Sequence, residues 1–237
     1  MGEGMDNDAL LMPFISSANI ACGYHAGDEE IIKKTINLSL QHGIAIGAHP
    51  GFADKENFGR SEQQLSNEQF YDLISEQLTI LQKFIDEAGA VLHHVKPHGA
   101  LYNMSAKDPL LANIIARAVK DHNASLILYG LSNSHSINEA EKLQLKIASE
   151  VFADRTYTDA GNLTPRTQPN ALISSEQQSL QQVLQMIQQQ TVTSTNNKII
   201  PVKADTVCIH GDGDHAVRFA QLIFKTLKEN NIAIKPV

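Results

Sequence analysis

Short apolar runs alternate along this chain with longer segments in which apolar residues recur every three to four positions. The short runs are typical of buried strands, and the longer segments are typical of amphipathic helices. The pattern predicts strands at residues 18–22, 44–49, 91–96, 126–130, 147–152 and 206–210. It predicts helices at residues 29–41, 66–88, 109–122, 136–143, 175–189 and 216–230. This alternation favours a parallel sheet with helical crossovers.

Local signals agree with several of these boundaries. Ser66, with Gln69 three residues later, resembles a capping box, and Asp28 precedes a helical stretch as a helix cap does. Gly43 stands where a helix is expected to end. Residues 161–205 are less regular, and their prolines together with Asn196-Asn197 predict loops and a short hairpin. No shift in composition marks a linker, so we expect a single domain over residues 1–237.

Polar side chains with candidate chemistry stand at or just after the ends of the predicted strands. They are Asn19, His25, His49, Lys96, His98, Glu150, Asp154, His210 and Asp212. In a barrel every strand brings its C-terminal end to one shared mouth, whereas in an open doubly wound sheet only the strands at the switch point do so. The positions therefore favour a barrel. The strand at 126–130 is an exception, because it offers only Tyr129.

Composition narrows the range of functions. At 237 residues and 42% hydrophobic, the chain is long enough to bury one full core. A net charge of -7 without a basic cluster argues against nucleic acid and favours a small-molecule substrate. Cys22 and Cys208 both lie in apolar runs, which favours buried thiols of a reducing compartment over a disulfide. The sequence shows no signal peptide and no membrane-spanning run, so the expected location is the cytoplasm, without a membrane partner.

Six ordered sequence runs resemble one known family. They are Asn19-Ile-Ala-Cys-Gly-Tyr-His-Ala-Gly-Asp28, Gly47-Ala-His-Pro-Gly51, Phe58-Gly-Arg60, Val95-Lys-Pro-His-Gly-Ala-Leu-Tyr-Asn103, Glu150-Val-Phe-Ala-Asp-Arg-Thr-Tyr157 and Cys208-Ile-His-Gly-Asp212. Together they resemble the LamB/YcsF family over essentially the whole chain. The resemblance implies an incomplete TIM-type barrel of seven strands, related to polysaccharide deacetylases. It also implies a 5-oxoprolinase that cleaves 5-oxoproline to L-glutamate coupled to ATP hydrolysis, working with two partner subunits.

The chain departs from the family pattern at two places. The family opens with a strand reading roughly Asp-Leu-Asn-Cys-Asp ahead of a Gly-Glu-Gly turn, whereas this chain begins at Met1-Gly-Glu-Gly4. We therefore expect the first barrel strand and its acidic residues to be missing, with a gap between the strands at 18–22 and 206–210. The family's Phe-Gly-Arg motif also ends in a second Arg, and Ser61 stands there in this chain.

The implied reaction sets the demands on the site. A five-membered lactam is a stabilised amide, so opening it needs activation, a directed water and charge stabilisation on the carbonyl oxygen. ATP supplies activation if it phosphorylates that oxygen. The sequence has no Gly-x-x-x-x-Gly-Lys-Ser/Thr loop. We therefore expect ATP to be shared with the partner subunits.

The candidate residues divide into two roles. The catalytic candidates are Lys96, His98, His210, Asp212 and Glu150. The substrate-binding candidates are Asn19, His25, His49, Arg60, Asn103, Asp154 and Arg155. Among these, Arg60, Arg155 or Lys96 suits the substrate carboxylate.

Several residues also have a purely structural interpretation. Glu150, Asp154 and Arg155 could form a self-contained cluster of ion pairs. Asp28 is a candidate helix cap, and a structural role is expected for His94 and its neighbour His93.

Two other functions stay open. His25, His49 and His98 with Asp28 or Asp212 have the composition of a divalent-metal site, which would suit a deacetylase-type amidohydrolase. The strand ends contain no His-x-x-x-His pair, so our primary interpretation includes no metal. The third possibility is a noncatalytic subunit that binds the substrate and presents it to its partners.

Overall fold

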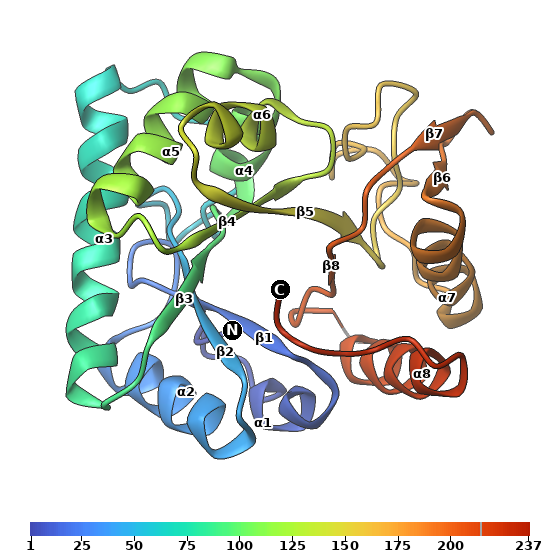
Figure 1. Cartoon of the computed structure of the whole chain (residues 1–237), viewed down its shortest axis with the longest axis horizontal. Coiled ribbons are helices and arrows are strands. Elements are labelled where there is room, and N and C mark those ends of the chain that lie inside the picture. Colours follow the sequence, from blue (N-terminus) through green and yellow to red (C-terminus); the bar gives the residue numbers. More distant parts are fainter. Residues whose placement is uncertain (214) are drawn as a thin grey trace.

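A computed structural model describes residues 1–213 and 215–237. Its main sheet has six parallel strands in the order β1-β2-β3-β4-β5-β8, with helices on the outside (Figure 1). The strands are β1 (Ser17–Ala21), β2 (Ala45–His49), β3 (Leu92–Val95), β4 (Ile127–Leu131), β5 (Lys146–Phe152) and β8 (Thr206–Cys208). Each predicted strand is present, with ends that differ from the prediction by at most two residues.

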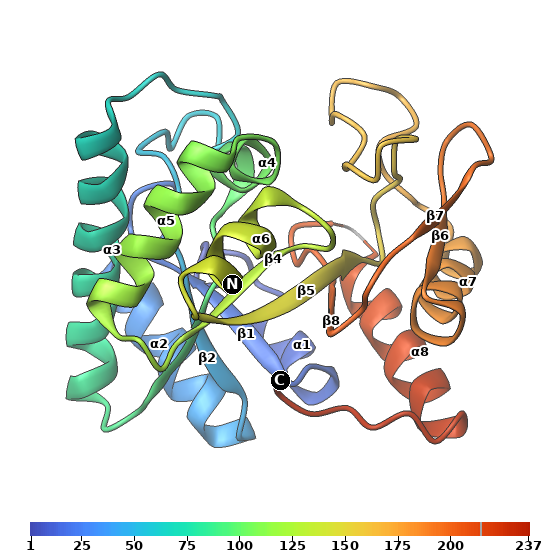
Figure 2. The same ribbon diagram turned by 45° about the horizontal axis from the view of Figure 1, so that its top comes forward.

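The sheet curls into a half-barrel, which confirms the predicted incomplete TIM-type architecture (Figures 1 and 2). It contains six parallel strands where the family resemblance implies seven. Within the described chain, β1 and β8 are its two edges, at the position where we expected a gap. Met1 runs along the edge of β1, where its amino group donates to the Asn19 carbonyl at 2.8 Å and its own carbonyl accepts from Ala21 at 3.0 Å.

The helices also follow the sequence pattern closely. They are α1 (Asp8–Leu11), α2 (Glu29–His42), α3 (Asn67–Glu87), α4 (Gly99–Lys107), α5 (Pro109–His122), α6 (His135–Lys142), α7 (Glu176–Leu184) and α8 (Ala216–Glu229). Sequence reasoning missed α1 and α4. Buried residues occur along most of α4, so its sequence lacks the polar face that reveals an amphipathic helix. The helix predicted at 175–189 is an α-helix followed by a π-helical turn at Gln185–Gln189.

The predicted capping signals are present. Ser66 and Gln69 form the reciprocal capping box of α3, with N···O distances of 3.2 and 2.8 Å. The Asp28 carboxylate accepts from the Ile31 amide at 2.9 Å, so Asp28 caps α2. Gly43 ends α2 at a φ of 66°, a left-handed conformation that favours glycine. These contacts fix where α2 and α3 start and where α2 ends.

Two apolar clusters hold the layers together. The larger packs β1 to β4 against α2, α3 and α5, and the smaller packs β5 against α7 and α8. The predicted hairpin is present as β6 (Thr191–Thr193) and β7 (Ile199–Pro201), which pair antiparallel. Both cysteines are free: Cys22 is buried, and Cys208 is partly exposed. No helix among the described residues is long and apolar enough to cross a bilayer.

Candidate functional site

A cavity of about 300 Å³ opens inside the half-barrel. Every predicted site residue except His25 and Asp154 lines it. The residues that line it are Asn19, His49, Arg60, Lys96, His98, Asn103, Glu150, Arg155, His210 and Asp212. This convergence arises because parallel strands bring their C-terminal ends to the same side. Asp154 borders a neighbouring cavity of about 330 Å³, which it shares with His210 and Asp212.

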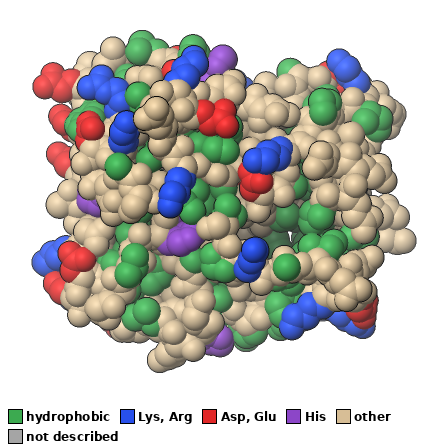
Figure 3. All heavy atoms as spheres, in the orientation of Figure 1, with side chains coloured by type: hydrophobic (Ala, Val, Ile, Leu, Met, Phe, Trp, Pro, Cys, Tyr) green, Lys and Arg blue, Asp and Glu red, His purple; other side chains and the backbone are tan. Residues whose placement is uncertain are grey.

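The cavity has a polar and an apolar part. Side chains near the C-terminal ends of β2, β3, β5 and β8 form the polar part. The helix α8 and the tail that follows it contribute apolar residues such as Leu227, Ile232 and Ile234. The space-filling view shows a hollow beside α8 in which apolar side chains gather (Figure 3). A small ligand that enters therefore has a polar group on one side and an apolar wall on the other.

Lys96 is the cation at the centre of the polar part. It follows β3, and its Nζ lies 2.7 Å from Oε1 of Glu150 on β5 and 3.0 Å from Sγ of Cys208 on β8. The side chains of Lys96 and Glu150 are 6% and 2% exposed, so both charges are withdrawn from water. Burial opposes the ammonium charge, but the contacts with the Cys208 sulfur and the Glu150 carboxylate outweigh it and raise the pKa of Lys96. Burial raises the pKa of the Cys208 thiol to about 12, so the sulfur is protonated at neutral pH.

Two buried polar atoms next to this ion pair have no hydrogen-bond partner in the described structure. They are Oε2 of Glu150 and the hydroxyl of Tyr102, which lie close enough to each other that Glu150, after burial, raises the pKa of the Tyr102 phenol. Both residues line the cavity, and the Tyr102 ring lies 5.6 Å from Nζ of Lys96. Buried polar atoms are normally satisfied. Their position beside Lys96 indicates where a polar ligand group would be received.

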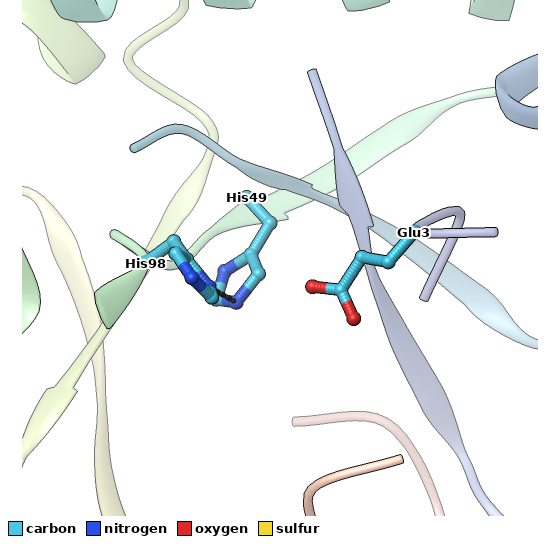
Figure 4. Close-up of side chains that lie close together, drawn as sticks. All are labelled: Glu3, His49 and His98. Atoms are coloured by element: carbon cyan, nitrogen blue, oxygen red, sulfur yellow. Dashed lines mark hydrogen bonds between the residues drawn. The ribbon is translucent and has the colours of Figure 1, made fainter. Parts of the chain in front are cut away.

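Three histidines and one carboxylate form a second group at the cavity wall. His49 ends β2, His98 directly precedes α4, and their rings meet with 3.0 Å between Nε2 of His49 and Nδ1 of His98. The Glu3 carboxylate points toward them from the opposite side (Figure 4). His25 is 1% exposed and stacks on His98, with ring centroids 3.8 Å apart. Its Nε2 lies 3.4 Å from Glu3, so His25 supports this group from behind.

Backbone carbonyl groups hold both of the meeting rings. Nδ1 of His49 lies 2.6 Å from the Lys96 carbonyl, and Nε2 of His98 lies 2.8 Å from the Phe58 carbonyl. Burial, together with the neighbouring His98 and Lys96, lowers the pKa of His49 well below its usual value. Burial first, and then His25, lower the pKa of His98 to about 3. Both rings are therefore neutral at pH 7.

The glycines of two sequence motifs make room for these rings. A Cβ on Gly59 would lie 2.9 Å from Cβ of His25 and 3.0 Å from a ring carbon of His98. A Cβ on Gly51 would lie 3.0 Å from the His25 ring and 3.1 Å from His98. Gly59 also has a φ of +64°. The close spacing of histidines and glycines in the sequence therefore has a packing cause.

Asp154 and His210 form a dyad at the end of β8. The Asp154 carboxylate accepts from the His210 backbone amide at 3.0 Å and lies 2.9 Å from its Nδ1. Burial opposes the charge on Asp154, but His210 lowers the pKa of this carboxyl to about 2. An ionised Asp154 fixes the His210 ring and leaves Nε2 as the nitrogen for chemistry. Asp154 was expected to bind the substrate. It contacts His210 instead and lies outside the larger cavity.

The proposed self-contained cluster of Glu150, Asp154 and Arg155 is wrong. Glu150 pairs with Lys96, and Asp154 pairs with His210. The Arg155 guanidinium donates to the Thr164 carbonyl at 2.5 Å and to the Ala171 carbonyl at 3.2 Å. Burial, and then the nearby Arg166, lower the pKa of Arg155 to about 10. Arg155 therefore braces the loop that follows β5 and lines the cavity with the rest of its side chain.

Two more arginines border the cavity. Arg60 pairs with Asp212 at 2.5 Å, and its guanidinium lies over the Phe58 ring at 4.9 Å. Arg166 lines both cavities with its side chain open to solvent, and partial desolvation followed by repulsion from Arg60 lowers its pKa. Arg60, Arg155 and Arg166 thus give this end of the cavity an excess of positive charge.

The remaining predicted residues have structural contacts as well as cavity positions. The Asn19 amide oxygen lies 3.0 Å from Nε2 of His94, which is completely buried and stacks on Tyr129. This confirms a structural role for His94. Asn103 donates to the Gly99 carbonyl at 3.0 Å, so its amide is partly committed to α4.

Comparison with known proteins identifies the family. The model of the LamB/YcsF family matches residues 1–237. The chain belongs to the LamB/YcsF family. It is 51% identical to the A subunit of 5-oxoprolinase from Brevibacillus brevis, over 99% of this chain and 94% of that protein. It is 49% identical to the same subunit of the enzyme from Tolumonas auensis, over 99% of this chain and 96% of that protein.

A solved structure gives the same fold. The lactam utilization protein from Thermus thermophilus superposes with a TM-score of 0.92 at 35% identity, covering 99% of this chain and 94% of that one. The family resemblance seen in the sequence is confirmed.

In this LamB/YcsF chain, sequence reasoning missed four residues of the site. They are Glu3, Tyr102, Arg166 and Cys208 in its contact with Lys96. Arg166 follows Pro165 in the irregular segment, where no periodicity indicates a site. For a metal site with the histidines, Asp28 or Asp212 was expected as the carboxylate. Asp28 caps α2 and Asp212 pairs with Arg60. The carboxylate beside His49 and His98 is that of Glu3. The glycines on either side of Glu3 were the available signal.

Proposed function

We propose that this chain is one subunit of an ATP-dependent 5-oxoprolinase that opens the lactam of 5-oxoproline to give L-glutamate. The names of its close relatives support the substrate, and the solved lactam utilization protein supports the class of reaction. The observation in the site that carries the proposal is the buried Lys96 ammonium, which Glu150 holds at 2.7 Å on the wall of a small cavity. These groups suit a small molecule with a carbonyl and an amide N–H.

Lys96 has the properties of an electrophilic catalyst. Water adds to the lactam carbonyl carbon, the C–N bond breaks, and the ring nitrogen gains a proton to become the amino group of glutamate. Negative charge develops on the carbonyl oxygen during the addition, and a fixed ammonium in a buried site stabilises it more than it stabilises the neutral amide. Glu150 holds Lys96 in place at 2.7 Å and keeps it charged.

The Asp154–His210 dyad supplies proton transfer in this proposal. His210 lines the cavity, and the 2.9 Å contact with Asp154 orients its ring. In this position it removes a proton from the attacking water and later returns one to the ring nitrogen. His98 and Asp212 stay candidates for contact with the substrate, because both line the same cavity.

The arginines suit the carboxylate of 5-oxoproline. Arg60 shares its charge with Asp212, and Arg155 donates to two backbone carbonyls. For Arg166 the described residues show no ion pair, so it is the guanidinium with the most bonding capacity left for a carboxylate. The cavity of about 300 Å³ is at the small end of ligand pockets, which suits a single cyclic amino acid.

ATP enters this proposal through the partner subunits. The sequence contains no P-loop, so we propose that the partner subunits bind ATP and couple its hydrolysis to the ring opening. We propose two such partner subunits, together with a cytoplasmic location, where ATP is available and the two free thiols stay reduced.

The test is glutamate release from 5-oxoproline and ATP, measured with this chain, with its partner subunits, and with all of them together. We expect glutamate and ADP in equal amounts only in the complete mixture. Glutamate formation by the partners alone would reduce this chain to a noncatalytic binding role and contradict the proposal.

A matched pair of variants tests the binding role. Arg166→Gln should raise KM for 5-oxoproline about tenfold or more, because one good ion pair to the carboxylate is lost. Arg117→Gln is the control. Arg117 lies on the exposed face of α5, so this variant should leave KM unchanged. Equal KM values for the two variants would remove Arg166 from the substrate site.

A further inference from the structure

The contacts of His49 and His98 require one more hydrogen than two neutral rings supply. Three contacts hold the pair: one from each ring to a backbone carbonyl, at 2.6 and 2.8 Å, and one between the rings at 3.0 Å. Each contact needs an N–H, because carbonyl oxygens only accept and a lone pair does not bond a lone pair. A neutral imidazole carries one N–H. Two rings therefore leave one contact as a repulsion between two lone pairs.

A cation between the two nitrogens removes this repulsion, and it is either a proton or a metal ion. The Glu3 carboxylate favours the metal ion, because it brings a third ligand atom within 4.8 Å of both ring nitrogens, which a proton shared by the two rings would not use. Carbonyl oxygens only accept, so the tautomers that satisfy both carbonyls place the N–H groups toward Lys96 and Phe58 and leave lone pairs on Nε2 of His49 and Nδ1 of His98. Histidines that bind metal ions are oriented in this way in proteins.

We propose that Nε2 of His49, Nδ1 of His98 and the Glu3 carboxylate bind one divalent first-row transition-metal ion. One ligand atom of each residue lies within 4.8 Å of the others. Two nitrogens about 2.1 Å from a common ion and 3.0 Å apart subtend roughly 90° at it. This angle suits neighbouring positions of a five- or six-coordinate ion. Figure 4 shows the Glu3 carboxylate approaching the space beside the two rings.

The surroundings of this site are built for fixed ligands. Gly51 and Gly59 leave space for the stacked rings of His25 and His98, and His25 lies 3.4 Å from Glu3. All three proposed ligands line the cavity, so the remaining coordination positions are open to water or to a ligand. A divalent ion bound by two imidazoles and one carboxylate lowers the pKa of a coordinated water, and this is a supply of hydroxide at neutral pH.

Direct metal binding tests the proposal without substrate, nucleotide or partner subunits. The full chain, without a polyhistidine tag, is stripped with a chelator and titrated with Zn²⁺ and with Co²⁺ at pH 7.5. We expect one ion per chain and, for Co²⁺, visible absorption bands of a nitrogen- and oxygen-ligated ion. Glu3→Gln should weaken binding at least tenfold, and His98→Gln should abolish it. Because no glutamate is measured, failure here is distinct from failure of the 5-oxoprolinase assay.

His42→Gln is the matched control, because His42 is an exposed histidine at the end of α2 and should leave binding unchanged. Circular dichroism shows whether each variant is folded, and Glu3→Gln keeps the test valid if His98→Gln does not fold. Substoichiometric binding by the wild type, or equal binding by wild type and Glu3→Gln, would overturn the proposal. The proposal would also be overturned if ¹⁵N NMR showed that the His49–His98 pair carries an extra proton at pH 7.5 and if added Co²⁺ gave no visible absorption bands.

Discussion

Replacing Lys96 with Met should destabilise the protein strongly, even though Met fills most of the same space. The change leaves the Glu150 carboxylate, which is 2% exposed, without the ammonium that lies 2.7 Å away. Removing one partner of a buried ion pair costs about 3–5 kcal/mol of unfolding free energy, because a buried charge is left uncompensated. At about 2–4 °C per kcal/mol for a chain of this size, the melting temperature should fall by roughly 6–20 °C.

A double variant separates the charge effect from the packing effect. Lys96→Met with Glu150→Gln removes both charges and keeps similar side-chain volumes, so it should be about 2 kcal/mol or more stable than the sum of the two single variants predicts. Urea unfolding followed by circular dichroism measures all four proteins of this cycle at pH 7. Lys33→Met is the control, because Lys33 is 39% exposed in its pairs with Glu29 and Glu87, and exposed ion pairs contribute little to stability.

Additivity would refute this reasoning. If the double variant loses the sum of the two single losses within about 0.5 kcal/mol, Lys96 and Glu150 are not coupled and the short contact between them has no energetic weight. A loss for Lys96→Met no larger than that for Lys33→Met would show that the Glu150 charge is solvated in the protein.

Two further predictions follow from single contacts. Because the folded state lowers the pKa of Asp154 from 3.8 to about 2, this group should contribute about 2 kcal/mol of stability above pH 4 that is lost as the pH falls toward 2. In acid unfolding, Asp154→Asn should lose less stability over that range than the wild type. An equal loss would show that His210 does not stabilise the Asp154 carboxylate. Gly47→Ala would place a Cβ 2.1 Å from the buried ring of His94 and should lower stability by about 1–3 kcal/mol or prevent folding, whereas Gly213→Ala meets no described atom within 4 Å and should change thermal stability little.

The sequence by itself determined most of the architecture. Strand and helix periods are local properties, so six parallel strands and the long amphipathic helices could be predicted within a few residues. The convergence of His49, Lys96 and His210 on one cavity was also predictable, because parallel strands present their C-terminal ends on one side. The helix α4 was missed, since it is buried on most of its surface and lacks a polar stripe.

Only the tertiary structure decided which polar groups are partners. Lys96 and Cys208 are 112 residues apart, and their 3.0 Å contact depends on how far the sheet curls between β3 and β8. A sequence pattern predicts the face of the sheet on which a side chain lies. It does not predict the distance from that side chain to a group on another strand. The same limit applies to Glu3, which reaches His49 and His98 because the first residues of the chain fold back along β1, a long-range contact that no local period encodes.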